Sequence, residues 1–377
     1  MIRVLHFISD SNIGGAGRLL VHCLRHFDRT WLEVSVAVPR GSALVPLMEE
    51  TGVRVIETEH GRDASRQRGA VAEYRRIIRE LKPHIVHTHS AFDARVASFL
   101  CGVKSRIYTR HSVFEPSRTL TTFPGRQIAG LVNNTLATRI IAVAEAAKDN
   151  LTATGVREDK ITVILNGVEP LAKTSAGERA ALRASLGIAE TDLVCGISAR
   201  FEPYKGHSYL IEAAKQVCAA RDDVKFLLMG TGSSYEETVA LAEKAGISDR
   251  VIFTGFLSDI VPYYNIMDLS LNCSWGTEAT SLALIEGMSL GLPAVVTRFG
   301  GNPGVIRDGE NGLLTPVKDA DAMAEAILRL AGDAKLYKNL SEGASRIFAE
   351  TFTAAAMTRK IEAVYRAEAE RCGFLDA

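Results

Sequence analysis

Residues 268–297 read DLSLNCSWGTEATSLALIEGMSLGLPAVVT. The stretch begins with an apolar strand that Gly276 interrupts, and it ends with a second apolar strand. Between the two strands, Thr280 or Ser281 is placed to cap a helix, and the Gly-Leu-Pro run at 291–293 ends that helix. A strand, a loop, a helix and a second strand in this order predict one unit of a parallel α/β sheet.

The loop in the middle of this unit is suited to an anionic ligand. At the carboxyl end of a parallel strand, the helix start at Thr280, Ser281 and Leu282 presents unpaired N–H groups and a positive dipole end to a phosphate. Glu278 lies in the loop and Glu286 lies on the helix. The two carboxylates can bind two hydroxyl-bearing parts of one ligand, although two solvated surface glutamates would show the same spacing.

Both halves of the chain repeat this alternation of strands and helices, which predicts two doubly wound parallel sheets. A polar stretch without a clear period, Leu171–Ala180, is interpreted as the linker between them. A cleft between the strand ends of two such sheets is the expected ligand site. Strands are predicted at Val4–Ile8, Leu32–Val38, Arg54–Ile56, Ile85–Thr88, Ser105–Thr109, Ile140–Ala144 and Ile161–Ile164, and then at Leu193–Ser198, Lys225–Met229, Val251–Thr254, Asp268–Asn272 and Ala294–Val296.

Length and composition support a globular protein of two α/β domains. The chain has 377 residues, of which 47% are hydrophobic and 23% are charged. No early apolar run reaches the roughly 18 residues of a membrane span, and the chain leads directly into a strand without a secretory signal, so we expect it in the cytosol. The six cysteines show no paired spacing, which argues against a disulfide framework and a zinc site.

The two halves differ in charge although the net charge is zero. Residues 1–166 contain 23 Lys and Arg against 16 Asp and Glu, and the remaining residues contain 21 against 28. The first half therefore carries +7 and the second −7. A basic half predicts an anionic surface or acceptor there, although such asymmetry also occurs without a function.

A glycine loop follows the first strand. Gly14 and Gly15 precede a helix predicted at Leu19–His26, so the backbone can approach a ligand closely, or the loop is only a tight turn. The loop fits a dinucleotide fingerprint poorly, because Leu20 stands where the third glycine belongs and the second strand ends without an acidic residue.

Three histidines stand at predicted strand ends in the first half: His87, His89 and His111. Because open α/β sheets bind ligands at these ends, we interpret His111 as a site residue. His87 and His89 resemble a metal pair, but the sequence around them shows no third ligand, so no metal is predicted. The basic and aromatic segment at 112–126 is predicted to bind an acceptor or to contact a membrane.

Loops of the second half carry further candidates. Arg200 and Lys205 follow a strand and can jointly neutralise a diphosphate, and Gly230 lies in a glycine turn near the expected nucleotide. Asp319 and Asp321 resemble a metal-binding carboxylate pair, but we interpret them as the cap of the following helix. A loop is predicted at 308–312.

These motifs together resemble the retaining glycosyltransferases of family 4, the group 1 glycosyltransferases with the GT-B fold. The likeness covers most of the chain, and its motifs are specific only as a set. They are Gly14-Gly15, ILNGVE at 164–169, Arg200 with Lys205-Gly206-His207, the Glu278 and Glu286 pair, and Gly291-Leu292-Pro293.

The resemblance implies two facing Rossmann-like domains with an interdomain cleft. The first, 1–166, binds the acceptor and includes a C-terminal helix at about 355–377; the second, 167–354, binds the donor. By the same likeness, Arg200 and Lys205 hold the donor diphosphate and Glu286 binds the ribose, while Glu278 and His111 contact the transferred sugar. His111, Arg200, Lys205 and Glu278 are thus the implied catalytic residues, and retention is expected through same-face displacement.

The chain also departs from the family. Many members read Glu-Gly-Phe-Gly at the first glutamate, where this chain has Glu278-Ala279-Thr280-Ser281, and Arg18 stands where many have a glutamate. The first change alters the backbone around the sugar, so the donor sugar does not follow from the likeness.

Other functions stay open at this point. A nucleotide-sugar 2-epimerase of the same fold would need acid and base groups around the sugar and no acceptor site. A glycoside hydrolase would need carboxylates on both sides of a glycosidic bond, and a nicotinamide enzyme would need the missing fingerprint. A non-catalytic sugar-nucleotide binder would not need all four of Arg200, Lys205, Glu278 and Glu286.

The expected reaction transfers a hexose from a nucleotide-sugar to a glycan or lipid-linked acceptor in cell-envelope polysaccharide or lipopolysaccharide assembly. Neither a cofactor nor a metal is expected, and no nucleic acid partner is predicted. The basic first half predicts peripheral contact with an anionic membrane, on the inner face of the cytoplasmic membrane.

Overall fold

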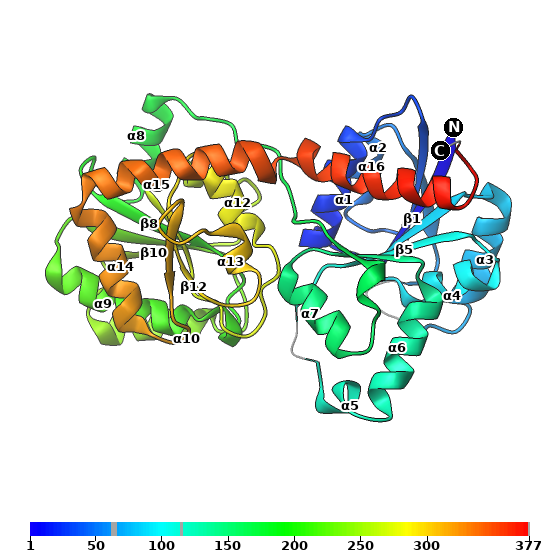
Figure 1. The fold of residues 1–377 in the computed structure, drawn as a ribbon. Helices are drawn as coiled ribbons and strands as arrows, with labels where there is room; N and C mark the ends of the chain where they lie inside the picture. The colour runs from blue at the N-terminus through cyan, green and yellow to red at the C-terminus, as the bar shows by residue number, and fades with distance from the viewer. Residues whose placement is uncertain (62–65, 114–115, 376–377) are drawn as a thin grey trace. The chain divides into compact units, whose positions relative to one another are not determined.

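The computed structural model describes residues 1–61, 66–113 and 116–375 (Figure 1). Two residues of the segment predicted to bind an acceptor, Phe114 and Glu115, lie outside this range. The chain forms two compact units. Unit 1 comprises Met1–Val168 with Ala354–Ala377, and unit 2 comprises Glu169–Thr353.

Unit 1 contains a parallel sheet of seven strands in the order β3-β2-β1-β4-β5-β6-β7. The order reverses at the β1/β4 pair, which is where doubly wound sheets bind ligands. In this pair His6 lies opposite His87, and in the next pair His89 lies opposite Thr109. The strands are β1 (Ile2–Ile8), β2 (Leu32–Pro39), β3 (Arg54–Thr58), β4 (Ile85–His89), β5 (Ser105–Arg110), β6 (Arg139–Ala142) and β7 (Ile161–Val163).

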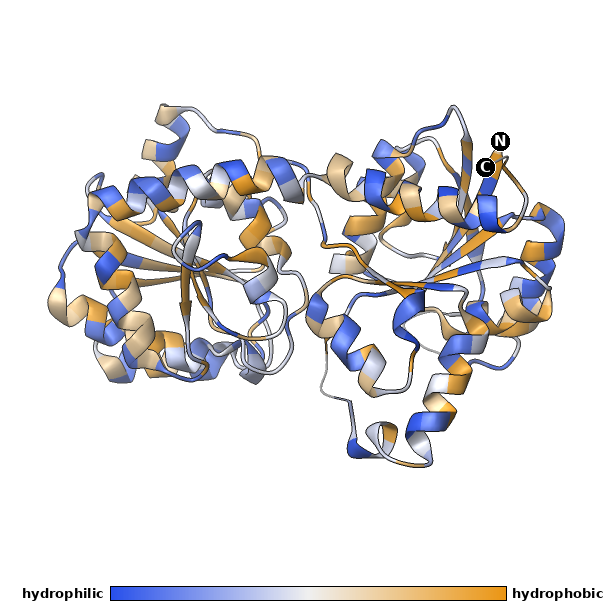
Figure 2. Cartoon of the chain, viewed as in Figure 1, coloured by the Kyte–Doolittle hydropathy of each residue, from blue (hydrophilic) through white to orange (hydrophobic). Residues whose placement is uncertain are grey.

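Amphipathic helices cover this sheet. Figure 2 shows hydrophobic residues along the strands and mixed hydropathy on the helices, the pattern of a sheet buried on both faces. The last helix, α16, packs against α1 although the chain between them passes through all of unit 2. The helices are α1 (Gly15–His26), α2 (Val45–Glu49), α3 (Ala70–Leu81), α4 (Phe92–Leu100), α5 (Arg118–Thr121), α6 (Gly125–Leu136), α7 (Glu145–Ala153) and α16 (Ala354–Arg371), with the 3₁₀ turn η1 (Glu158–Lys160).

Unit 2 repeats the architecture with six parallel strands in the order β10-β9-β8-β11-β12-β13. Its order reverses at β8/β11. The strands are β8 (Leu193–Ser198), β9 (Val224–Met229), β10 (Val251–Gly255), β11 (Leu269–Asn272), β12 (Ala294–Thr297) and β13 (Gly312–Thr315). The helices are α8 (Ala176–Ser185), α9 (His207–Ala220), α10 (Tyr235–Ala245), α11 (Val261–Tyr264), α12 (Leu282–Ser289), α13 (Asn302–Val305), α14 (Ala320–Gly332) and α15 (Ala334–Ile347), with the short turns η2 (Pro203–Lys205) and η3 (Phe348–Phe352).

The predicted α/β class and parallel sheets are confirmed, but two local predictions are wrong and one strand was not predicted. Part of the predicted linker forms α8, because Ser175 and Glu178 make a reciprocal capping box that compensates for a weak apolar period. Helix α1 begins at Gly15 rather than at Leu19. Strand β13 was not predicted, since four residues after a glycine turn carry too little pattern.

Two predicted caps can be compared with the structure. Asp319 caps α14 as expected, accepting a hydrogen bond from the backbone N–H of Ala322 at 2.9 Å. Ser281 occupies the cap position of α12, but its side chain makes no capping hydrogen bond there.

Candidate active site

The loops of unit 2 that carry the candidate residues follow two adjacent strands. Arg200 and Lys205 come after β8, and Glu278 comes after β11, which is paired with β8 at the reversal point of the sheet. Parallel strands end at the same edge, so side chains that are far apart in sequence meet there. The structure brings Lys205 and Glu278 into an ion pair of 2.8 Å.

The Glu278 carboxylate is held by three donors on one oxygen. Its Oε2 accepts hydrogen bonds from Lys205 Nζ at 2.8 Å, from Ser274 Oγ at 2.9 Å and from Asn272 Nδ2 at 3.1 Å. The side chain is 10% exposed. Its other oxygen, Oε1, has no partner among the described residues. A fixed carboxylate with one free oxygen is arranged to accept a hydrogen bond from a ligand hydroxyl.

Sequence reasoning missed the polar network that holds this carboxylate. Besides Ser274 and Asn272, it includes Asn302, whose Nδ2 donates to Asn272 Oδ1 at 3.3 Å and to the carbonyl of Thr297 at 2.9 Å. The one available signal was the change from apolar to polar residues at the end of β11. A buried polar group needs partners, so this change marks a site.

Arg200 and Lys205 differ in how much the protein uses them. Arg200 is exposed, and Nη2 donates to the hydroxyl of Tyr204 at 3.2 Å. Most of its five N–H groups therefore remain for a ligand. The Lys205 side chain is 16% exposed, and its ammonium is oriented by Glu278. Together, the planar guanidinium of Arg200 and the compact ammonium of Lys205 can bind one anion.

Two glycines allow the loops around these cations to approach one another closely. Gly206 has φ +75°, and a Cβ there would lie 2.1 Å from the carbonyl oxygen of Cys273. Gly230, the predicted nucleotide-side glycine after β9, has φ +135°, and a Cβ would lie 2.1 Å from the carbonyl of Ala199. Any other residue at either position would displace a loop of the site.

Helix α9 begins beside Lys205 with a buried histidine. The ring of His207 stacks on Phe201 at a centroid distance of 4.1 Å, and neither ring nitrogen has a hydrogen-bond partner in the described chain. Burial, assisted by the charge of Lys205, lowers the pKa of His207 to about 4. The ring is therefore neutral and adds no third charge to the site.

The helix start after Glu278 has the predicted placement. Thr280 and Ser281 are buried, Leu282 is the first residue of α12, and Ser281 Oγ accepts from Asn272 Nδ2 at 3.4 Å. Glu286 lies on the same helix and is 2% exposed. A carboxylate buried to this degree is not the solvated surface glutamate that the spacing alone permitted.

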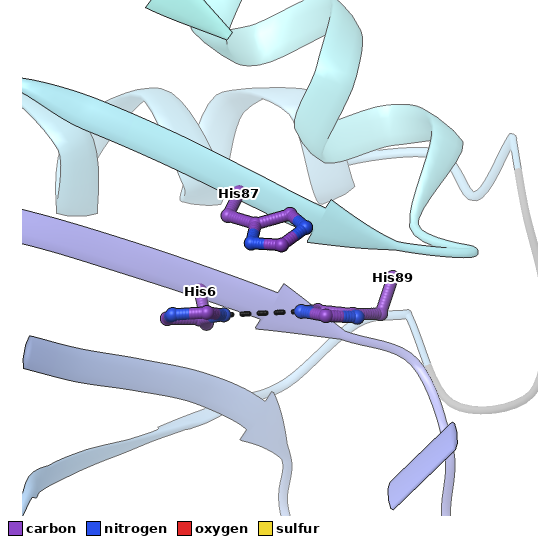
Figure 3. A group of neighbouring side chains, drawn as sticks. All are labelled: His6, His87 and His89. Carbon is purple, nitrogen blue, oxygen red and sulfur yellow. Dashed lines mark hydrogen bonds between the residues drawn. The ribbon is translucent and has the colours of Figure 1, made fainter. Parts of the chain in front are cut away.

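The other predicted site residues belong to unit 1. Gly14 and Gly15 form the start of α1, and His111 follows β5. The structure surrounds His111 with histidines that the sequence did not connect. His89 Nδ1 lies 2.9 Å from His111 Nε2, and His89 Nε2 lies 3.0 Å from His6 Nδ1 (Figure 3).

The histidines also supply a third potential metal ligand that sequence reasoning missed. One nitrogen each of His6, His87 and His89 lies within 4.8 Å of the others, the single group of this kind in the described residues. A metal would need each nitrogen about 2.0–2.1 Å away. Yet His87 already bonds Tyr365 and Thr109 at 2.6 Å through its two nitrogens, and His6 bonds His89. The nitrogens are engaged with protein groups, so the arrangement fits a hydrogen-bonded cluster better than a metal site.

Unit 1 also contains a cavity of about 700 Å³ beside α6. Three arginines line it, Arg66, Arg95 and Arg110, together with apolar side chains that include Leu120 and Ile128. No acidic side chain lines it within residues 1–61, 66–113 and 116–375. The cavity is therefore both cationic and apolar.

Comparison with known proteins identifies the sequence class of both units. The model of Glycosyltransferase Family 4 matches residues 13–170, and the model of Glycosyl transferases group 1 matches residues 178–346. N-acetyl-alpha-D-glucosaminyl L-malate synthase of Bacillus anthracis is 25% identical over 292 residues, covering 74% of each chain.

A second relative and a solved structure agree with these models. The UDP-Gal:alpha-D-GlcNAc-diphosphoundecaprenol alpha-1,3-galactosyltransferase of Escherichia coli is 25% identical over 300 residues, covering 77% of each chain. The crystal structure of Anabaena HepE in complex with UDP matches with a TM-score of 0.83 and 24% identity, covering 97% of this chain and 100% of that one. The fold is that of the GT-B structures, and these matches give no support to the epimerase alternative.

Proposed function

The chain belongs to the group 1 glycosyltransferases, and from this membership we propose that it transfers a hexose from a UDP-sugar to a lipid-linked glycan, with retention of configuration. The observation that carries the proposal is the ion pair between Lys205 and Glu278, with the exposed Arg200 on the same loop as Lys205. These residues follow β8 and β11, where the strand order of the unit 2 sheet reverses. The UDP in the HepE structure and the UDP-galactose in the name of the E. coli relative support the choice of nucleotide.

Each candidate side chain receives one role in this proposal. Arg200, Lys205 and the N–H groups at the start of α12 bind the diphosphate, and Glu286 accepts hydrogen bonds from the ribose hydroxyls. The free Oε1 of Glu278 accepts one from the transferred sugar. Gly14 and Gly15 allow close backbone approach to the donor, Gly230 lies beside the nucleotide, and His111 contacts the sugar. The position of both carboxylates supports these roles, because Glu278 and Glu286 are buried on the loop and the helix that follow β11 at the reversal point of the sheet.

The proposed step breaks the bond between the anomeric carbon and the diphosphate oxygen. The acceptor oxygen bonds to that carbon on the same face, and its proton passes to the departing diphosphate. Negative charge grows on the diphosphate as the bond breaks, so fixed cations bind the transition state more tightly than the ground state. Arg200 and Lys205 supply that charge without a metal ion in this scheme.

A nucleotide screen tests the proposal. We expect UDP to raise the melting temperature more than GDP or ADP, because binding to the folded state stabilises it by mass action. UDP-hexoses are then incubated with and without acceptor. Sugar transferred with the anomeric configuration retained is the expected result. Epimerised donor without transfer, or no stabilisation by any of the three diphosphates, would contradict the proposal.

The acceptor is proposed to bind in the cavity of unit 1. Arg95, which lines it, is only 6% exposed, and its Nε has no hydrogen-bond partner. Its Nη2 donates to Asn133 Oδ1 at 2.9 Å, and the guanidinium stacks over the ring of Tyr108 at 4.3 Å. Burial lowers the pKa of this guanidinium, and no carboxylate of the described chain pairs with it. A desolvated cation is costly without an anion, and the diphosphate of a lipid-linked glycan would provide one.

Arg95→Gln tests this assignment. We expect the KM for a polyprenyl-diphosphate-linked N-acetylglucosamine to rise at least about tenfold, since a hydrogen bond to a charged group contributes roughly 1.5–3 kcal/mol. The KM for the UDP-sugar stays unchanged. Arg79→Gln, at an exposed arginine on α3 that does not line the cavity, is the control. An unaltered acceptor KM in folded Arg95→Gln enzyme rules the site out.

A surface of unit 1 on and next to α6 is also proposed to contact the membrane, with the protein bound peripherally at the cytoplasmic face. Phe123 is 81% exposed and Leu131 is 69% exposed, both in or next to α6, which also carries Arg126. Exposed apolar side chains among arginines favour an anionic bilayer surface. No helix of the described chain is both long and apolar enough to cross a bilayer.

We expect the double change Phe123→Ser and Leu131→Ser to weaken binding to phosphatidylglycerol-containing vesicles about tenfold, because apolar contact area with the bilayer is lost. Phe256→Ser, at a side chain in unit 2 that is 77% exposed, should leave binding unchanged. Co-sedimentation with the vesicles measures the binding of both variants. An equal loss of vesicle binding in the two variants would show that binding depends on exposed apolar side chains in general and not on this surface.

A further inference from the structure

We propose that His6, His89 and Tyr365 are positioning residues that hold His111 in one tautomer, with a proton on Nε2 and a bare Nδ1 as the nitrogen that accepts from its ligand. The inference rests on the proposed function only for the identity of that ligand, a sugar hydroxyl. It goes beyond that function because it explains which atom of His111 acts and why.

The observation is a continuous chain of hydrogen bonds through the centre of unit 1. It runs from His111 to His89 at 2.9 Å, from His89 to His6 at 3.0 Å and from His6 to the hydroxyl of Tyr365 at 3.3 Å. Tyr365 continues to His87 at 2.6 Å, and His87 ends the chain on Thr109 at 2.6 Å. Strand register makes the chain possible, because His6, His87 and Thr109 stand on neighbouring strands β1, β4 and β5.

All four rings in the chain are neutral. Burial lowers the pKa of His6 to about 3 and that of His111 to about 4, and it lowers the pKa values of His87 and His89 well below their ordinary range. A neutral imidazole has one donor nitrogen and one acceptor nitrogen. The direction of one hydrogen bond therefore sets the direction of the next along the whole chain.

Tyr365 sets that direction. It has a single O–H, and burial raises its pKa well above the ordinary value, so it stays protonated. Its distance to His87 Nδ1 is 2.6 Å and its distance to His6 Nε2 is 3.3 Å. The shorter contact is the one expected for the O–H donor, which gives Tyr365 donating to His87 and accepting from His6.

The remaining protons follow from this choice. His6 carries its proton on Nε2, so its Nδ1 accepts from His89 Nε2. His89 Nδ1 then accepts from His111 Nε2, which leaves His111 Nδ1 without a proton. On the other side His87 Nε2 donates to Thr109. The structure agrees at the open end, because His111 Nδ1 is the buried ring nitrogen of the chain that has no partner.

A bare nitrogen at this position can accept a hydrogen bond from a hydroxyl but cannot donate one. We therefore infer that His111 selects a hydroxyl-bearing group, and that the neutral ring adds no charge near the sugar. A protonated or flipped tautomer would turn Nδ1 into a donor, and it could then no longer accept the hydroxyl proton. The chain prevents that change, because reversing His111 would require every link up to Thr109 to reverse with it.

The test uses the full-length enzyme labelled with ¹⁵N-histidine. Tyr365→Phe removes one hydroxyl and keeps the ring that packs beside Phe27. Tyr337→Phe is the control, since Tyr337 is partly buried and its hydroxyl donates to the carbonyl of Asp268 in unit 2. Ring ¹⁵N shifts distinguish a bare nitrogen from a protonated one, and the His111 signals are identified by their loss in His111→Gln.

In the wild type we expect a single His111 tautomer with a bare Nδ1, and in Tyr365→Phe a mixture of two. The kcat should fall about tenfold in Tyr365→Phe with the donor KM unchanged, as expected when a reacting group loses its orientation. The Tyr337→Phe control should keep the single His111 tautomer and the wild-type kcat. A protonated Nδ1 in the wild type, or a single unchanged tautomer in Tyr365→Phe, overturns the inference.

Two other results are informative in the same experiment. Stoichiometric binding of Zn²⁺ that removes the His6 and His89 N–H signals would identify a metal site and overturn the hydrogen-bonded chain. Failure of the wild type to transfer any sugar would contradict the proposed function, and the tautomer measurement would still decide the inference on its own.

Discussion

Lys205→Ala should lower kcat for sugar transfer by about a thousandfold or more. The ammonium is held by Glu278 at 2.8 Å and, in the proposed mechanism, faces the diphosphate as its charge grows. Removing one fixed donor from a developing anion typically costs about 10²–10³ in rate. Here the lost group is a full charge on a side chain that is 16% exposed, so we place the effect at the upper end of that range or beyond it.

The variant needs a check that it still folds. Without Lys205, the Glu278 carboxylate retains Ser274 and Asn272 as donors, so we expect a loss of about 1–3 kcal/mol in the free energy of unfolding rather than collapse. Lys215→Ala, at an exposed lysine on α9, controls for the loss of a surface charge. Near-normal turnover of folded Lys205→Ala enzyme, measured with saturating donor, would refute the assigned role.

Glu286→Gln should raise the donor KM about a hundredfold while kcat changes little. A carboxylate that accepts hydrogen bonds from two ribose hydroxyls binds more tightly than an amide, and hydrogen bonds to charged groups contribute roughly 1.5–3 kcal/mol. The ribose is remote from the bond that breaks, so this binding is equal in the ground and transition states and affects KM.

The matched control is Glu325→Gln, which changes an exposed glutamate on α14. Steady-state kinetics with varied UDP-sugar measure both variants, and the UDP-induced shift in melting temperature should shrink in parallel for Glu286→Gln. If that variant instead lowered kcat at an unchanged KM, Glu286 would belong with the reacting groups and the ribose assignment would be wrong.

The fold was predictable because its signals are local. Strands on neighbouring stretches of chain carry short apolar runs, and helices such as α3, Ala70–Leu81, repeat apolar residues at helical spacing. The prediction failed where the local pattern was short or weak. Strand β13 has four residues, and α8 depends on the capping contact between Ser175 and Glu178.

The candidate site of unit 2 was predictable in part for the same reason. Lys205 and Glu278 follow predicted strands. A loop at the carboxyl end of a strand indicates a ligand site, and this can be recognised without knowing which distant residues lie nearby. Their ion pair joins residues 73 positions apart, so its existence could only come from the sheet order. The roles of both residues remain predictions until the variants are measured.

By itself the sequence determined the α/β class, the two parallel sheets and the loops that carry charge, since hydrophobic periodicity is a property of neighbouring residues. Only the tertiary structure decided which polar groups share hydrogen bonds. His6 and His89 are 83 positions apart, and His87 and Tyr365 are 278 apart. No local pattern encodes such contacts. Strand order and the return of α16 to unit 1 create them, and burial then favours hydrogen bonds among the polar groups brought together there.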